Sequence, residues 1–464
     1  MLRYIFLVIL LSFVGGWYLL RLDLDPTFIE GVVGQPVDLI PGPGSRNPVD
    51  EILEELLFRP LFTYDREGKI VPDLAESYTT SKNGEIYDIT LKKSYWLDGT
   101  AITVADVTFT FTREPAFSKI TIEQEGGRRV RFVLENPLSS FLDILTKPIA
   151  PAHFREIPLD SLGSGDFYIT DVEKEGGRIS ELRLQSKKSG AIKNLVFKFF
   201  PDEESLKEAA MQGEVDSVSD VSFSSEYFTL YERPMPNRYF ALFFNLGADN
   251  PLAKDVKFRA AASKKTPLAS GGLVKGPMSG TWAQAKLSFP RFTSKSAKKF
   301  KGSISITVPK TNGVANIAKG IASTWEEEFG IDVKVKEVSA SQLERVLEER
   351  DFEAIILGQE VNRDPDRYNL WHSSQREYPG QNIAGYADPR ADRALEEGRA
   401  TLARSARKIH YTNFQRLFIE DNPVVFLNHP NFNWWVNSKF AGPDLTPIFS
   451  PVERFWNFSD WTRN

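Results

Sequence analysis

The chain has 464 residues, with 57 Lys and Arg against 62 Asp and Glu, and its net charge of −5 gives no reason to expect a nucleic-acid partner. Hydrophobic residues make up 41% of the chain and aromatic residues 12%, a composition typical of globular rather than disordered proteins. Because the chain has no Cys, it excludes disulfides, zinc–thiolate sites and cysteine nucleophiles.

The first apolar segment, Tyr4–Leu20, lies between Arg3 and Arg21. A membrane-spanning helix needs about 20 apolar residues, with about 17 as the lower limit. The end of this segment, Gly15–Tyr18, does not match the small-x-small pattern at which signal peptides are cleaved. We therefore interpret residues 1–22 as an uncleaved membrane anchor, with a cleaved signal peptide as the alternative.

Residues 56–113 contain a dense series of turns and short elements. Asn83-Gly84 predicts a turn, because both residues tolerate a positive φ. Residues 86–91 alternate between two sets of side chains, which predicts a strand with one buried face. Thr103 stands three residues before Asp106, a spacing that predicts a capping box at the start of a helix.

The order of these motifs resembles that of the family 5 extracellular solute-binding proteins, the oligopeptide and dipeptide binders of ABC importers. The residues that carry the resemblance are Phe58–Leu61, Tyr64-Asp65, Val71–Ser77, Asp98–Thr100, Ala105–Val107, Gly163–Phe167, Gly213–Asp216, Asn245 and Gly385–Asp392. The resemblance covers nearly everything after about residue 30.

The resemblance implies an α/β, two-lobed fold like that of periplasmic binding proteins (type II, cluster C-like), here with an N-terminal transmembrane helix. We expect the anchor or signal at residues 1–22, lobe I with a small subdomain at 23–246, lobe II at 247–425, and a return to lobe I at 426–464. The Gly- and Pro-rich residues 31–48 then form the start of lobe I, although their composition is also that of a flexible linker.

Residues 303–357 form the clearest α/β unit. Alternating strands at 303–308 and 331–335 flank a helix whose apolar face ends before Gly330, a predicted C-cap. A second helix and a strand at 352–357 complete a β-α-β-α-β order, which implies a mainly parallel sheet. In such sheets ligands lie outside the carboxyl ends of the strands.

We predict the ligand site at the carboxyl ends of these strands and in the segment that follows the last strand. We add aromatic residues, because aromatic side chains suit the walls of a site that binds a ligand without catalysing a reaction. The predicted ligand-binding residues are Gly358, Gln359, Glu360, Asn362, Asp364, Trp371, Asn382, Tyr64 and Trp434.

The chain departs from the family pattern just after Gly358. Peptide binders that it resembles often carry an acidic residue here, which pairs with the α-ammonium of the peptide. In this sequence Gln359 replaces the family's Trp, and Asn362 stands near the place of the acid. A buried ammonium needs a charged partner. Either Glu360 or Asp364 takes that role, or the ligand is not a peptide with a free amino end.

The function implied is capture of a peptide-like solute for an ABC permease at the extracytoplasmic face of the membrane. We expect a monomer tethered by the N-terminal helix, with no enzymatic activity, no catalytic residues, no cofactor and no bound metal. The ligand class stays open among peptide, glycoside, nickel complex and none. One alternative is a carboxylate-based hydrolase or transferase using Asp364, Asp366 or Glu360. Another is an envelope protein that kept the fold and lost its ligand.

Overall fold

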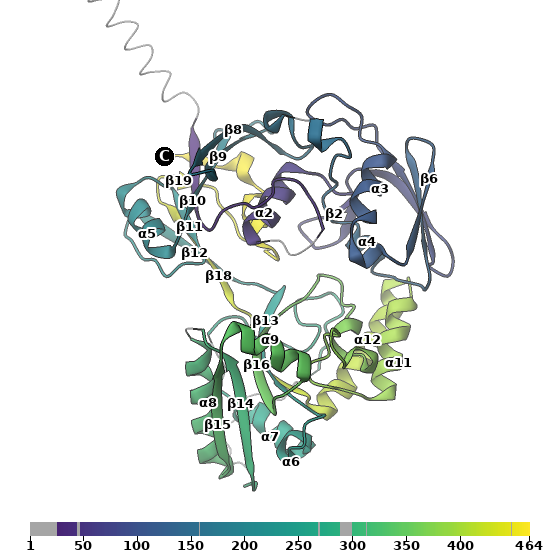
Figure 1. The fold of residues 1–464 in the computed structure, drawn as a ribbon, viewed down its shortest axis with the longest axis vertical. Coiled ribbons are helices and arrows are strands. Elements are labelled where there is room, and N and C mark those ends of the chain that lie inside the picture. Colours follow the sequence, from purple (N-terminus) through teal and green to yellow (C-terminus); the bar gives the residue numbers. More distant parts are fainter. Residues whose placement is uncertain are drawn as a thin grey trace, which may run out of the picture.

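The computed structural model describes residues 26–43, 47–156, 158–267, 270–287, 299–311, 313–446 and 448–464. These residues form two α/β lobes, lobe I above and lobe II below in Figure 1. The chain starts in lobe I, crosses into lobe II and returns to lobe I near its C-terminus. The predicted two-lobed α/β architecture is confirmed.

Lobe I is built around a mixed seven-stranded sheet of order β12-β18-β11-β1-β10-β9-β8. Strand β1 (Thr27–Val33) runs parallel to β10 and β11, and the other neighbours pair antiparallel. The first residues of the Gly- and Pro-rich segment 31–48 therefore belong to a strand of lobe I, as expected for the start of that lobe. The remaining elements are α2 (Pro48–Leu57), β8 (Phe167–Glu175), β9 (Arg178–Ser186), β10 (Asn194–Phe200), α5 (Glu203–Gln212), β11 (Ser217–Ser219), β12 (Phe228–Pro234) and β18 (Asn431–Asn437).

A small subdomain extends lobe I with an antiparallel sheet of order β4-β5-β7-β6. Alternate residues of β5 are buried, as predicted, and Gly84 turns the preceding chain with a φ of 74°. The predicted capping box is also confirmed, because the Thr103 N–H donates to Asp106 Oδ2 at 2.8 Å. The elements are β2 (Phe62–Tyr64), β3 (Ile70–Pro72), β4 (Ala75–Thr80), β5 (Ile86–Leu91), α3 (Val104–Thr112), β6 (Ile120–Glu125), β7 (Arg129–Leu134) and α4 (Phe141–Ile144).

Lobe II contains a five-stranded sheet of order β15-β14-β16-β13-β17. Strand β14 is parallel to both β15 and β16, which confirms the predicted β-α-β-α-β unit. Helices α7 and α8 pack on one face, and α11 and α12 pack on the other. The elements are β13 (Arg238–Phe244), α6 (Pro251–Lys254), α7 (Val256–Lys265), β14 (Ser303–Pro309), α8 (Val314–Phe329), β15 (Asp332–Val338), α9 (Ala340–Glu349), β16 (Ala354–Glu360), α10 (Tyr368–Trp371), α11 (Pro389–Ala400), α12 (Arg404–Asp421) and β17 (Val424–Asn428).

The C-terminal segment completes the core of lobe I. Phe28 of β1 packs edge-on against Phe440 and Trp461, with ring centroids 4.9 and 5.0 Å apart. The tail therefore packs in the core of lobe I. Its short elements, with the other short elements of the chain, are β19 (Phe440–Ala441), β20 (Thr462–Arg463), η1 (Pro115–Phe117), η2 (Phe154–Glu156), η3 (Leu159–Ser161), η4 (Ser373–Gln375), η5 (Pro451–Phe455) and η6 (Phe458–Asp460).

The two crossings between the lobes differ in place from the predicted domain boundaries. Strands β13 and β17 hydrogen-bond within the sheet of lobe II, whereas β12 and β18 pair with each other in lobe I. The crossings therefore fall at residues 235–237 and 429–430, instead of at 246/247 and 425/426. The prediction recognised both strands from their apolar runs but assigned each crossing to the strand rather than to the short link beside it.

The predicted N-terminal helix at residues 1–22 lies outside the described residues. Among the helices of the described ranges, none combines the length and the apolar character that crossing a membrane requires.

Candidate functional site

A cavity of about 1650 Å³ lies between the two lobes. We call it the main cavity. Lobe I contributes α2, the hairpin that contains Tyr64, the start of α4 and the segment 449–459. Lobe II contributes the segment that follows β16, from Asn362 to Asn369, and Arg399 at the end of α11. Because both lobes supply walls, any change in their separation changes the shape of the cavity.

A second cavity of about 710 Å³ lies at the crossings, and we call it the hinge cavity. The carboxyl end of β16, Gly358–Glu360, lines it together with Arg238 and residues 430–433. Arg238 Nε lies 2.8 Å from Glu360 Oε1, and the Glu360 side chain is 73% exposed. The carboxyl end of β16, which the sequence predicts to contact ligand, therefore lies in the solvent-exposed hinge cavity beside the crossings.

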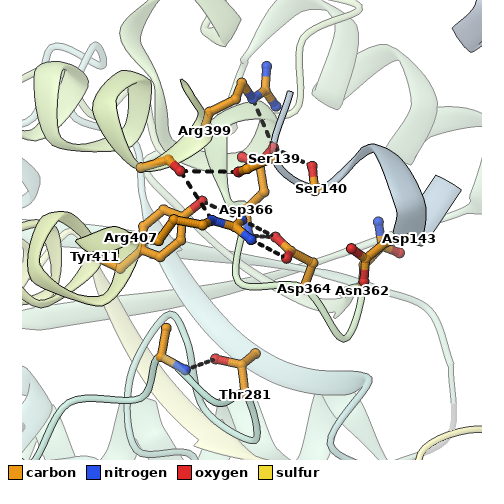
Figure 2. Close-up of polar contacts among 12 residues, drawn as sticks. Ser139, Ser140, Asp143, Thr281, Asn362, Asp364, Asp366, Arg399, Arg407 and Tyr411 are labelled. Carbon is orange, nitrogen blue, oxygen red and sulfur yellow. Dashed lines mark hydrogen bonds and ion pairs between the residues drawn. The ribbon is translucent and has the colours of Figure 1, made fainter. Parts of the chain in front are cut away.

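Asp364 is held by a buried ion pair at the wall of the main cavity. Its two carboxylate oxygens lie 2.6 and 2.8 Å from the guanidinium of Arg407, as Figure 2 shows. Both side chains are almost fully buried. Arg407 Nη2 also donates to the Tyr411 hydroxyl at 3.0 Å. Asp364 is thus already neutralised within lobe II and is a poor partner for a ligand ammonium.

The lobes also contact each other on the side away from the crossings. The Ser139 N–H donates to the Arg399 carbonyl oxygen at 2.8 Å, and Ser140 Oγ donates to Asp366 Oδ2 at 3.2 Å. Arg399 Nε donates to the same Asp366 oxygen at 2.8 Å, and Figure 2 shows these contacts between the two lobes. The crossings and these contacts join the lobes on opposite sides of the main cavity, and we call this arrangement closed.

Two carboxyl groups in the main cavity have strongly raised pKa values. Burial, followed by the nearby Asp364 carboxylate, raises the pKa of Asp143 to about 7, and the Tyr64 hydroxyl donates a hydrogen bond to Asp143. Glu55 lines the main cavity with an exposed side chain, and the protein around the cavity desolvates its carboxyl group. That desolvation, followed by repulsion from Glu453, raises the pKa of Glu55 to about 8. Both groups change charge near neutral pH.

Six of the predicted ligand-binding residues line one of the two cavities: Tyr64, Asn362 and Asp364 the main cavity, and Gly358, Gln359 and Glu360 the hinge cavity.

The other three predicted residues lie in the packed interior. Trp371 stacks on Phe243 in lobe II and is 1% exposed. The Asn382 amide, which has no exposure, donates to the backbone carbonyl of Tyr386 at 2.8 Å. Trp434 donates its indole N–H to the buried Glu30. We correct the prediction by leaving Trp371, Asn382 and Trp434 out of the candidate site, because all three side chains are buried in the packed interior of the lobes.

The sequence did not single out Glu55, Asp143, Arg363 or Glu453, all of which line the main cavity. Glu55 and Glu453 look like ordinary surface charges in sequence, and Arg363 like a loop residue. Asp364 and Asp366, two of the carboxylates named for the hydrolase alternative, each form an ion pair with an Arg. No group of three or more metal-binding side chains occurs in the parts of the chain that the structure describes.

Comparison with known proteins identifies relatives of the whole chain. The family model for bacterial extracellular solute-binding proteins, family 5 Middle, matches residues 69–264. The oligopeptide-binding protein AppA of Bacillus subtilis (strain 168) is 23% identical over 506 aligned positions, which cover 93% of this chain and 91% of AppA. The probable di/tripeptide-binding protein 5 of Pseudomonas aeruginosa (strain UCBPP-PA14) is 22% identical, and the alignment covers 85% of this chain and 88% of that protein.

Solved structures share the fold. HbpA2 from Haemophilus parasuis superposes with a TM-score of 0.76 at 16% identity, over 94% of this chain and all (100%) of that one. NikZ from Campylobacter jejuni, solved with Ni(L-His), superposes with a TM-score of 0.70 at 22% identity, over 94% of this chain and 99% of that one. Motif order, fold and relatives agree, and the chain is similar along most of its length to the family 5 extracellular solute-binding proteins.

Proposed function

We propose that the chain is the solute-binding component of an ABC importer and captures a peptide-like solute in the main cavity. The observation that carries this proposal is the cavity itself. It measures about 1650 Å³, its walls come from both lobes, and the chain passes between those lobes at two short crossings within the described residues. Sites for drug-sized ligands typically measure roughly 300–1,000 Å³. The main cavity therefore has room for a ligand larger than a single small molecule.

The relatives favour a peptide as the solute. AppA of Bacillus subtilis is named an oligopeptide-binding protein, and DppA from Helicobacter pylori was solved in complex with the peptide STSA. NikZ, in contrast, was solved with Ni(L-His), so the fold also accommodates a chelated metal. In this chain the main-cavity walls carry both carboxylates and cations, which suits a solute with several charged and polar groups.

Glu360 is the better candidate for the α-ammonium of such a peptide. Asp364 is committed to Arg407, whereas Glu360 is largely exposed and shares its charge with Arg238 alone among the described residues. Glu360 also lies close enough to Glu51 of the main cavity to help raise the pKa of Glu51, after the larger effect of burial. A peptide that reaches from the main cavity toward the crossings would meet Glu360 at its amino end.

Capture would proceed by closure of the lobes around the solute. Closure expels water from the cavity and strengthens polar contacts there. The solute shifts the balance between open and closed states only by binding the closed state more tightly. No covalent step is needed. The closed, loaded protein would then present its solute to a permease that has its own ATPase.

We also propose that the protein works outside the cytoplasmic membrane as a monomer, tethered by residues 1–22. The support is the apolar run Tyr4–Leu20 and the similarity of the chain to extracellular solute-binding proteins.

Ligand screening of the full chain, purified in detergent, tests this function. We expect a short peptide to co-purify in native mass spectra, or to raise the melting temperature, whereas oligosaccharides leave it unchanged. Ligand at 100 times its dissociation constant adds about 2.7 kcal/mol to the free energy of unfolding, which is readily measured. A melting temperature that rises only with oligosaccharides, or with none of the solutes, would contradict the proposal.

A further inference from the structure

Arg363 occupies a cage of aromatic and acidic side chains in the main cavity. Its guanidinium carbon lies 4.4 Å from the ring centroid of Phe449, 4.8 Å from that of Tyr64 and 6.0 Å from that of Trp456. The same guanidinium forms an ion pair with Glu453. The Arg363 and Glu453 side chains are only 13% and 7% exposed. We call Tyr64, Phe449, Glu453 and Trp456 the cation cage.

The cage and its occupant belong to different lobes. All four cage residues are part of lobe I, from the β2–β3 hairpin and the C-terminal segment around η5. Arg363 follows β16 and is part of lobe II. When the lobes separate, Arg363 leaves with lobe II, and the cage faces the widened cavity without its cation.

The cage keeps its need for a cation when Arg363 leaves. Glu453 Oε2 accepts a hydrogen bond from the Phe449 N–H at 2.7 Å, which holds the carboxylate in place independently of lobe II. A buried carboxylate without a partner is unfavourable, and a guanidinium over an aromatic face gains about 0.5–2 kcal/mol. A planar cation from another source therefore fits the vacated cage.

A second carboxylate stands beside the cage. Glu55 of α2 lines the same cavity and makes no ion pair or hydrogen bond with any residue in the described ranges. The cavity lining as a whole contains ten acidic and seven basic residues, so a cationic solute balances its charge better than an anionic one. When Glu55 is deprotonated, Glu55 and Glu453 together carry two negative charges, against the single positive charge of Arg363.

We propose that the cation cage is a subsite for an arginine side chain of the bound peptide, and that Arg363 fills it as an internal competitor when no solute is present. This inference rests on the proposed function, because it assigns a side-chain preference to the same cavity. On entry the solute guanidinium replaces that of Arg363 between the three rings, pairs with Glu453 and gains Glu55 as a second acidic neighbour.

Paired peptides test the preference. One peptide contains arginine, and its partner contains citrulline, which has nearly the same shape without the charge. We expect the wild-type protein to bind the arginine peptide about tenfold more tightly than the citrulline peptide, a ratio within the range of a desolvated cation–π contact.

Arg363→Ala should increase this preference several-fold by removing the competitor, and Glu55→Gln should reduce it. Arg129→Ala, at an exposed site on β7, is the matched control. Equal binding of the two peptides by wild-type protein and by Arg363→Ala would overturn the proposal.

Refilling the empty cage separates this inference from the proposed function. Methylguanidinium should raise the melting temperature of Arg363→Ala, whereas neutral methylurea should not. Neither compound should raise the melting temperature of the wild-type protein. Refilling without any peptide binding would support the cage as a cation site and count against the importer function. Binding of peptides without refilling, and without an arginine preference, would keep the importer function and overturn the cage.

Discussion

The ion pair between Asp364 and Arg407 stabilises lobe II from the wall of the cavity. Asp364→Asn leaves the Arg407 charge buried without a full partner, and removal of one partner of such a pair costs about 3–5 kcal/mol. We expect a loss of that size in the free energy of unfolding, measured by urea denaturation. Asp171→Asn, at a side chain that is 58% exposed, should change it little.

A double variant separates the two roles of this pair. Asp364→Leu combined with Arg407→Met removes both charges and should recover much of the lost stability, because apolar replacements of buried ion pairs are often close to neutral. If the double variant were as unstable as Asp364→Asn, the cost would come from lost packing and not from an unpaired charge.

Glu55 makes the stability depend on pH in a defined direction. Its pKa is about 8 in the folded chain, mainly through desolvation, with Glu453, Glu51 and Glu54 adding repulsion and Arg363 opposing them. In the unfolded chain a Glu titrates near pH 4.3. Between these values the folded state binds more protons than the unfolded state, so stability falls as pH rises from about 4.3 to 8.

Glu55→Gln should remove this part of the pH dependence. The variant should match the wild type at pH 4 and exceed its melting temperature at pH 8. Glu208→Gln, at an exposed position on α5, is the control and should leave the pH profile unchanged. Parallel melting curves for wild type and Glu55→Gln across this range would show that Glu55 titrates like an ordinary surface carboxyl.

The turn at Gly163–Gly165 docks lobe I elements onto the end of α2, and glycine is required there by contact distance. A Cβ at Gly165 would lie 2.3 Å from the Leu56 carbonyl oxygen, far inside van der Waals contact. Gly165→Ala should therefore destabilise the protein by about 1–3 kcal/mol, the usual cost of overpacking. Gly127→Ala is the control, since its Cβ would meet nothing within 4 Å. Equal melting temperatures for the two variants would show that α2 shifts freely away from this turn.

Elements with strong local signals were predictable from sequence, and their partners were not. The alternation in β5, the capping box before α3 and the β14-α8-β15-α9-β16 unit all follow from periodicity and end signals. The apolar runs of β13 and β17 were also recognised, but an apolar run does not reveal which sheet a strand joins. That choice depends on long-range pairing with β16, and it places the crossings in short links on either side.

The lining of the candidate site was predictable only in part, for the same reason. Tyr64, Asn362 and Asp364 do line the main cavity, because each follows a strand or hairpin that ends there. Trp371 and Trp434 were chosen as aromatic walls, yet their rings pack in the cores of the two lobes. The cation cage combines residues 64, 363 and 449–456, and no local pattern relates positions so far apart in the chain.

At the scale of the whole molecule, closure depends on a balance between internal and solute contacts. The closed lobes are joined by the Ser139 and Ser140 contacts with α11 and Asp366, and by Arg363 in its cage. Each of these joins the two lobes without any solute. A peptide must therefore replace at least the Arg363 contact and still favour the closed state. The hypothesis of an envelope protein without a ligand predicts, in contrast, that these internal contacts alone hold the lobes together.

A distance measurement between the two lobes tests the central claim most directly. The chain has no Cys, so two exposed residues, Lys82 in lobe I and Lys408 on α12, can be changed to Cys and spin-labelled without background. Double electron–electron resonance spectroscopy then gives the distribution of distances between the two spin labels, with and without an arginine-containing peptide. We predict a broad distribution that includes an open population, which the peptide narrows to the single short distance of the closed structure. A distribution that is already narrow and that no peptide changes would contradict capture by closure of the lobes.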